Sequence, residues 1–174
     1  MMEDVLNLAK DIKLLIFDVD GVLTDGTLYL TDENIEFKAF NSLDGLGIKL
    51  LLETGVEIAI ITARKSAVVT ARMQSLCIKH VYQCALDKIP AYNDLLKKLQ
   101  LNDNQVAYMG DDLTDLPLIK KARLGIAPPN AIEFVKQQAN YVTTQSGGKG
   151  AAREVCDLIM KAQGTLEKIY NRFL

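Results

Sequence analysis

Two aspartates stand directly behind an apolar run near the start of the chain. Residues 14–17 are Leu-Leu-Ile-Phe, Asp18 follows at once, and Asp20 comes two positions later. Four consecutive apolar residues predict a short strand that is buried on both faces. In a parallel α/β fold, ligands bind beyond the carboxyl ends of the strands. The pattern therefore places acid chemistry at the edge of a sheet.

Two further apolar runs end in polar residues. Residues 56–61 and 105–109 predict core strands, and the polar side chains that follow them include Thr62 and Asp111. Because parallel strands all end on the same side of a sheet, we expect these strand ends to converge on the end that carries Asp18.

A cluster of Asp18, Asp20 and Asp111 is unfavourable unless its charges are neutralised. Mg²⁺ with oxygen ligands is the natural partner, and it would also polarise a phosphoryl oxygen. An aspartate then serves as a nucleophile that forms an acyl phosphate. The phosphoryl oxygens need donors and cations. Those in reach are expected to be the Thr62 hydroxyl, the backbone N–H groups of residues 19–21, and Lys88.

Strand and helix patterns alternate from residue 14 onward. This alternation predicts an α/β fold, a Rossmann-like, mostly parallel sheet with helices on both faces. Residues 27–40 interrupt it as a β-hairpin with a turn at 32–34, and Ile35, Phe37 and Ala39 are expected to form one buried face. Further strands are expected at 80–82, 124–127 and 141–142, and helices at 1–13, 44–55 (with Asp44 as the N-cap), 66–76, 90–100, 116–122, 132–138 and 151–163, before a polar tail.

Length and composition favour one domain over residues 1–174. Apolar residues make up 49% and charged residues 24%, and the net charge is −2. Without a basic run or an 18-residue apolar stretch, we expect neither nucleic-acid nor membrane binding. The acidic start of the chain argues against export, so a cytoplasmic protein is expected. The three cysteines are expected to be buried thiols, and a single histidine, His80, makes a histidine-based metal site improbable on composition.

Four segments in order resemble the motifs of the haloacid-dehalogenase-type phosphatases. They are residues 18–26 (DVDGVLTDG), residues 61–64 (ITAR), Lys88, and residues 110–115 (GDDLTD). The resemblance implies the fold of that superfamily. It also implies that Asp18 is the nucleophile and a metal ligand.

Within that superfamily the chain most resembles the 3-deoxy-D-manno-octulosonate 8-phosphate phosphatases of lipopolysaccharide biosynthesis, on residues 40–45 (FNSLDG) and 147–158 (GGKGAAREVCDL) as well. The resemblance implies that Asp20 is the general acid and base and gives its carbonyl to Mg²⁺, and that Asp111 completes the metal site with Asp112 or Asp115 in support. It implies that the phosphoryl group is held by Thr62 and Lys88, and that the sugar acid is bound by Asn41, Ser42, Leu43, Asp44, Gly45, Lys49, Arg64 and Arg72.

The resemblance also implies a phosphatase without a cap domain that forms a homotetramer. Its hairpins would build a central barrel, and a neighbour would close the pocket. The apolar residues of the hairpin fit this, because a small domain hardly covers them alone. The glycine-rich stretch 147–150 is either a plain turn or the start of a tail (147–174) that reaches a neighbouring subunit.

Three interpretations stay open on the sequence. The substrate is either the eight-carbon sugar-acid phosphate or a nine-carbon phosphate of the sialic-acid type. The third interpretation is a catalytically silent oligomerisation module. Two departures bear on the substrate: Lys49 stands where an arginine is also seen and lacks its bidentate fork, and Ala63 stands where a glycine is common.

Overall fold

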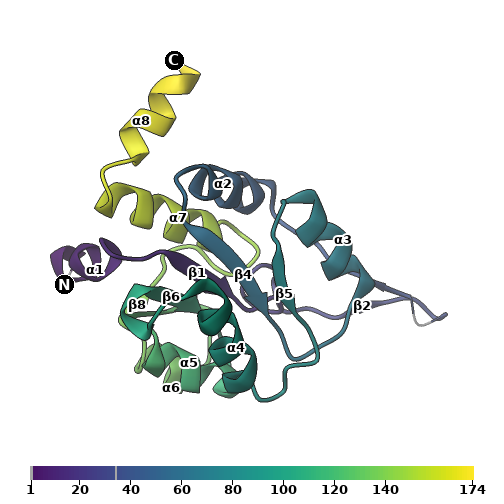
Figure 1. Ribbon diagram of the computed structural model, residues 1–174. Coiled ribbons are helices and arrows are strands. Elements are labelled where there is room, and N and C mark those ends of the chain that lie inside the picture. The colour runs from purple at the N-terminus through teal and green to yellow at the C-terminus, as the bar shows by residue number, and fades with distance from the viewer. Residues whose placement is uncertain (1, 34) are drawn as a thin grey trace.

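A six-stranded parallel sheet forms the centre of the molecule (Figure 1). The structure is a computed structural model that describes residues 2–33 and 35–174. The strands lie in the order β5-β4-β1-β6-β7-β8, and every neighbouring pair is parallel. Their bounds are β1 (Leu14–Phe17), β4 (Glu57–Ile61), β5 (His80–Tyr82), β6 (Val106–Met109), β7 (Leu124–Ala127) and β8 (Tyr141–Val142). The predicted α/β class is confirmed.

The strand order reverses direction between β1 and β6. From β1 the chain builds outward through β4 and β5, and then returns to place β6 on the other side of β1. Phe17, the last residue of β1, pairs with Ile60 on one side and with Met109 on the other, so the three central strands end at nearly the same level. Such a reversal opens a crevice beyond the carboxyl ends of the strands, where ligands of open α/β sheets bind.

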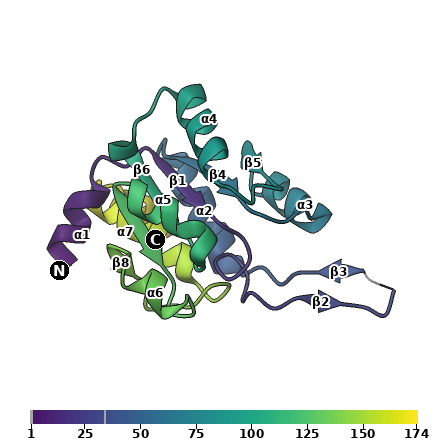
Figure 2. The ribbon, with the colours of Figure 1, turned by 90° about the horizontal axis from the view of Figure 1, so that it is seen from below.

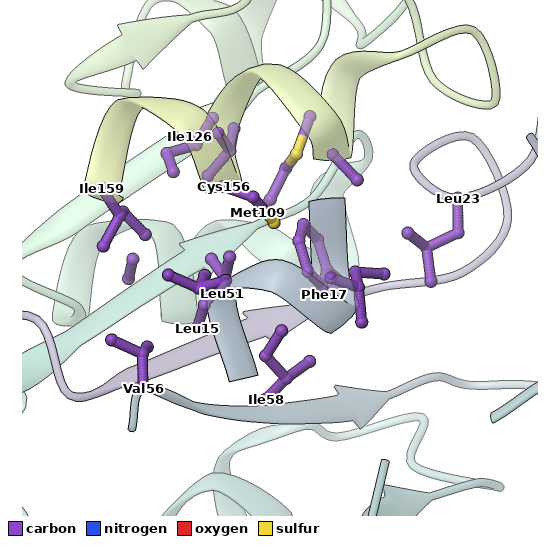
Figure 3. Packing of buried hydrophobic residues seen from close by; sticks show 14 of the residues in the cluster. Leu15, Phe17, Leu23, Leu51, Val56, Ile58, Met109, Ile126, Cys156 and Ile159 are labelled. Carbon is purple, nitrogen blue, oxygen red and sulfur yellow. The ribbon is translucent and has the colours of Figure 1, made fainter. Parts of the chain in front are cut away.

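Helices cover both faces of this sheet. One face is covered by α1 (Met2–Ala9), α2 (Ser42–Glu53), α3 (Ala67–Ser75) and α7 (Ala151–Ala162), and the other by α4 (Ile89–Leu99), α5 (Leu116–Lys121) and α6 (Glu133–Lys136). Alternate side chains of β1 serve the two cores. Leu15 and Phe17 pack toward α2 and α7 (Figure 3), and Leu14 and Ile16 pack toward α4 and α5. Burial on both faces explains why β1 is apolar throughout.

The hairpin extends from the body as a thin arm (Figure 2). Its paired strands, β2 (Tyr29–Leu30) and β3 (Glu36–Phe37), are shorter than predicted, and the predicted turn includes Asn34, which lies outside the described residues. The predicted buried face is wrong for the single chain, because Ile35 and Phe37 are more than half exposed. The alternation itself is present, but Glu36, Lys38 and Phe40 are partly buried, whereas Ile35, Phe37 and Ala39 are exposed. Between β1 and α2, the described residues hold no inserted domain besides this arm.

The expected polar tail contains α8 (Leu166–Tyr170) and a 3₁₀ turn (Asn171–Phe173), which project from the body beyond α7 (Figure 1). The expectation of three buried thiols is wrong for two of them. Only one of the three cysteines, Cys156, is buried, and Cys77 and Cys84 are exposed. Among the described residues, no helix combines the length and the apolar character that crossing a membrane requires.

Asp44 does not cap its own helix. The α2 helix begins at Ser42 and has Asn41 as its N-cap, whose side chain accepts a hydrogen bond from the Leu43 N–H. The buried Asp44 carboxylate instead accepts from the backbone N–H groups of Gly150 (3.3 Å) and Arg153 (2.8 Å) at the start of α7. Asp44 thus caps α7, which begins about a hundred residues later in the chain, and does not cap α2.

We predict that Asp44→Ala lowers the free energy of unfolding by about 1–2 kcal/mol, because it leaves buried N–H groups at the start of α7 without an acceptor. Urea denaturation monitored by circular dichroism measures the change. The exposed Asp94, whose carboxylate pairs with Lys98, supplies the control, since Asp94→Ala should stay within about 0.5 kcal/mol of the parent protein. Equal stability of the two variants would contradict this role of Asp44.

Candidate active site

Three carboxylates meet at the crevice between β1 and β6. Asp18 follows β1, Asp111 follows β6, and Asp115 ends the 3₁₀ turn Leu113–Asp115; each contributes one oxygen to a group whose atoms all lie within 4.8 Å of one another. The convergence of Asp18 and Asp111 predicted from the strand ends is therefore present in the fold. Of the two alternatives for a supporting acid, the structure brings in Asp115 and leaves Asp112 exposed.

The loop after β1 bends back onto Asp111. Gly21 has φ +80°, and a Cβ added there would lie 2.0 Å from Asp111 Oδ2, so the approach needs a glycine. The far side of the loop is supported by Asn130, whose side chain donates to the Gly21 carbonyl (2.8 Å) and accepts from the Gly147 N–H (2.7 Å). The Gly148 N–H donates to the Val22 carbonyl (3.0 Å). The glycine-rich stretch is thus a turn packed on the loop of its own chain.

Lys88 places an ammonium group among the carboxylates. It stands at the N-terminus of α4, and its fully buried Nζ lies 3.2 Å from Asp18 Oδ1 and 2.6 Å from Asp115 Oδ1. Burial by itself would lower the pKa of Lys88, but the neighbouring carboxylates of Asp18 and Asp115 outweigh burial and raise it. The amine is therefore charged at neutral pH, and one cation faces three acids.

Asp115 is saturated with hydrogen bonds. Its Oδ1 accepts from Lys88 and from the Tyr108 hydroxyl, and its Oδ2 accepts from the backbone N–H groups of Asp111 (3.0 Å) and Asp112 (3.1 Å). These four donors suit a carboxylate that orients its neighbours. Tyr108 was not singled out from the sequence, because it lies inside an apolar core strand and belongs to no motif.

Asp18, by contrast, has a carboxylate oxygen that accepts no hydrogen bond from the residues that the structure describes. Its Oδ1 is buried and has no hydrogen bond of acceptable geometry among the described residues, although it lies within ion-pair distance of Lys88. Burial, and then the charge of Asp115, raise the pKa of Asp18 to about 6. Burial, followed by the charges of Asp115 and Asp18, raises the pKa of Asp111 to about 7. A buried carboxylate oxygen that no hydrogen bond from the described residues satisfies, beside a second carboxylate of raised pKa, fits a hard divalent cation with oxygen ligands.

The remaining predicted catalytic residues lie on the same edge. Thr62 is buried and follows β4 directly, one strand away from Asp18. The Asp20 carboxylate lies apart from the acidic group and is paired with Lys38. Its part in metal binding, predicted for the backbone carbonyl, stays a prediction.

The predicted sugar-acid residues fall into separate places. Four of them, Asn41, Asp44, Gly45 and Arg72, line one small cleft. Arg72 Nη2 there donates to the Asn41 carbonyl (3.5 Å), and a Cβ on Gly45 would lie 2.4 Å from the same Nη2. The Asp44 carboxylate faces α7 rather than the cleft opening, as shown above.

The other predicted residues of this set lie outside that cleft. Arg64 is bound to Glu36 of the hairpin (2.6 Å), and Ser42, Leu43 and Lys49 are exposed on α2. The larger hollow between α2, α7 and α8 includes none of the predicted site residues in its lining. Its described lining holds a single acidic side chain, Glu167, and no cluster of acids, so we place the active site at the carboxylates of the crevice.

The fold and the four motif segments together define a class. Residues 65–155 match the haloacid dehalogenase-like hydrolase family. The curated protein named 3-deoxy-D-manno-octulosonate 8-phosphate phosphatase KdsC of Escherichia coli (strain K12) is 47% identical over 165 residues, which is 95% of this chain and 88% of that protein. Its namesake from Yersinia pestis is 46% identical over the same shares of both chains.

Solved structures agree with this match. The phosphatase of the same name from Moraxella catarrhalis, determined with a magnesium ion, a phosphate ion and a KDO molecule, has a TM-score of 0.98, is 43% identical and is covered over 100% of both chains. A probable YrbI-family phosphatase from Pseudomonas syringae has a TM-score of 0.97 at 50% identity, over 98% of this chain and 97% of that one. The chain belongs to the haloacid dehalogenase-like hydrolases, and within them to the family of these KdsC proteins.

We predict that Mg²⁺ stabilises the chain more at pH 8 than at pH 5. The raised pKa values of Asp18 and Asp111, about 6 and 7, mean that the folded state holds more protons than the unfolded state between about pH 4 and pH 7. The metal-free protein therefore loses stability as pH rises through this window. A cation that replaces those protons restores the stability, by at least about 3 °C in Tm at pH 8 and by less than about 1 °C at pH 5.

Differential scanning fluorimetry with and without Mg²⁺ measures this difference. Asp111→Asn should abolish the Mg²⁺-dependent shift in Tm, whereas the exposed control Asp94→Asn should keep it. An equal shift at both pH values in the parent protein would show that the cation binds elsewhere.

Proposed function

We propose that this chain is a Mg²⁺-dependent phosphatase that hydrolyses 3-deoxy-D-manno-octulosonate 8-phosphate to the free sugar acid and phosphate, in lipopolysaccharide biosynthesis. The observation that carries the proposal is the buried Oδ1 of Asp18, which lies near Lys88 but accepts no hydrogen bond from the described part of the chain. This oxygen belongs to the acidic group at the sheet crevice. The names of the curated relatives and the ligands of the Moraxella structure support the substrate.

The first chemical step belongs to Asp18. One of its carboxylate oxygens attacks the phosphorus, the bond from phosphorus to the sugar oxygen breaks, and an aspartyl phosphate forms. Lys88 and Thr62 hold the phosphoryl oxygens, on which charge builds up. Asp18 and Asp111, with the Asp20 carbonyl, would hold Mg²⁺, and the bound ion would supply further positive charge to the phosphoryl group.

Asp20 moves the protons. It gives a proton to the departing sugar oxygen, and it then takes one from the water that cleaves the aspartyl phosphate. These two roles need a carboxyl that is near the reacting atoms without being a metal ligand. The Asp20 carboxylate fits the second part of this condition, since it is partly exposed and lies outside the acidic group.

Cationic side chains at the rim select an acidic sugar. We assign the substrate carboxylate to Arg64 and Arg72, with Lys49 and the segment 41–45 as further contacts. Arg72 is placed by the small cleft, and Arg64 reaches from the loop after β4 toward the hairpin.

The test is phosphate release from purified protein with Mg²⁺. The eight-carbon sugar-acid phosphate should have a kcat/KM at least tenfold above that of a nine-carbon sialic-acid-type phosphate. A preference for the nine-carbon ester would replace the substrate, and no release from any phosphate ester would favour a silent oligomerisation module.

We predict that Asp18→Asn lowers kcat by at least about 10⁴-fold, because the amide oxygen does not form the same acyl phosphate. Steady-state phosphate release measures the loss. Asp11→Asn, at a carboxylate that is 73% exposed, controls for the substitution and should leave kcat unchanged. Appreciable steady-state turnover by Asp18→Asn would exclude the aspartyl-phosphate route.

The protein is further proposed to be a cytoplasmic homotetramer assembled through the hairpin. Leu28, Leu30, Ile35 and Phe37 are each more than half exposed, and Tyr29 stacks on Phe37 with 5.1 Å between ring centroids. Such an apolar arm in water is unfavourable, and pairing with other arms would cover it.

We predict that Phe37→Glu shifts the protein from tetramer to smaller species, because it puts a charge into the covered face. Multi-angle light scattering should give four times the chain mass of 19.3 kDa for the parent protein. Phe134 of α6 is equally exposed, at 54%, and Phe134→Glu should leave the mass unchanged. A parent protein that is monomeric at micromolar concentration would contradict the assembly.

A further inference from the structure

The carboxyl of Asp20 is held by a residue that belongs to none of the four motifs. Lys38 lies just beyond β3, and its Nζ donates to Asp20 Oδ1 at 2.5 Å. The Lys38 side chain is only 2% exposed, although it follows the half-exposed Phe37 on the same arm. The hairpin thus places one buried ammonium group against the loop after β1.

The other side of Lys38 is fixed as well. Its Nζ lies 3.3 Å from Glu36 Oε1, and Glu36 in turn accepts hydrogen bonds from Arg64 Nη2 (2.6 Å) and from Ser66 Oγ (2.8 Å). The ammonium is therefore held between two carboxylates, one on the loop after β1 and one on the hairpin. The loop after β4 secures the second of these.

This arrangement leaves one Asp20 oxygen free. Lys38 occupies Oδ1, and no described residue forms a hydrogen bond to Oδ2. The Asp20 side chain keeps 22% of its surface exposed, so the free oxygen is accessible to a reacting group. A carboxyl with one fixed oxygen loses the rotational freedom that an unpaired aspartate would have, and such orientation lowers the barrier for proton transfer.

We propose that Lys38 is a positioning residue that orients Asp20 for proton transfer to the leaving group. The inference rests on the proposed function, in which the bond from phosphorus to the leaving oxygen breaks and that oxygen takes its electron pair and a proton from Asp20. Lys38 acts through Asp20 and does not contact the phosphoryl group. Because two carboxylates already neutralise the Lys38 ammonium, it is less suited to bind the carboxylate of the sugar.

The test compares phenyl phosphate with 4-nitrophenyl phosphate. The two esters lack the sugar carboxylate and differ in the basicity of the leaving oxygen, so phenolate needs the proton and 4-nitrophenolate leaves with little help. The value of kcat/KM reports the step that cleaves this bond. We expect Lys38→Met to lower kcat/KM for phenyl phosphate about tenfold more than for 4-nitrophenyl phosphate.

Three comparisons make the result specific. In an Asp20→Asn background, Lys38→Met should cause no additional leaving-group effect, because the two residues act as one unit. Lys98→Met, at an exposed lysine that also pairs with an aspartate, should leave both esters unchanged. Glu36→Gln, which removes the charge of the second partner of Lys38, should show the same leaving-group effect in weaker form and serves as the test if Lys38→Met does not fold.

Equal losses on both aryl esters would show that Lys38 only supports the structure, and a loss confined to the sugar-acid ester would show that it binds substrate. Either result would overturn the inference while leaving the proposed function intact. A parent protein that hydrolyses no phosphate ester with Mg²⁺ would instead remove the proposed function itself.

Discussion

One buried ammonium, paired with two carboxylates of a three-carboxylate cluster, is the constraint on which the rest of the structure depends. Lys88 offsets part of the charge of Asp18, Asp111 and Asp115, and the remaining excess of negative charge prepares the crevice for a cation. The reversal of strand order brings the acids together, and Gly21 lets the loop approach them. The core on both sheet faces fixes the strands that end there, so the electrostatic demand is supported by ordinary apolar packing.

The sequence was sufficient for the sheet because its strands are short apolar runs that end in polar residues. That pattern alone predicts that Asp18, Thr62 and Asp111 lie on one edge. It was not sufficient for contacts between distant segments. Two such contacts are the capping of α7 by Asp44 and the hydrogen bond from Tyr108 to Asp115. Both depend on tertiary packing, and the sequence near these residues does not predict their partners.

The hairpin shows where pattern analysis fails for a physical reason. Alternation separates two faces of a strand but does not say which face meets the protein. The apolar face of residues 35–39 was expected inside, yet the polar face turns inward, because Glu36 and Lys38 find charged partners at the rim of the crevice. A hairpin whose apolar residues predict only packing contacts therefore also forms ion pairs with residues at the active site.

The support of the loop after β1 by the turn at Gly147 and Gly148 has a consequence for biosynthesis. Asn130 and this turn support the loop from its far side. The segment that contains Asp18 is therefore synthesised well before the residues that support it. An emerging polypeptide that stops short of residue 148 already contains every acid of the crevice but lacks part of the wall against which the loop rests. The wall behind this loop is therefore completed late in translation, after all six strands of the sheet have been synthesised.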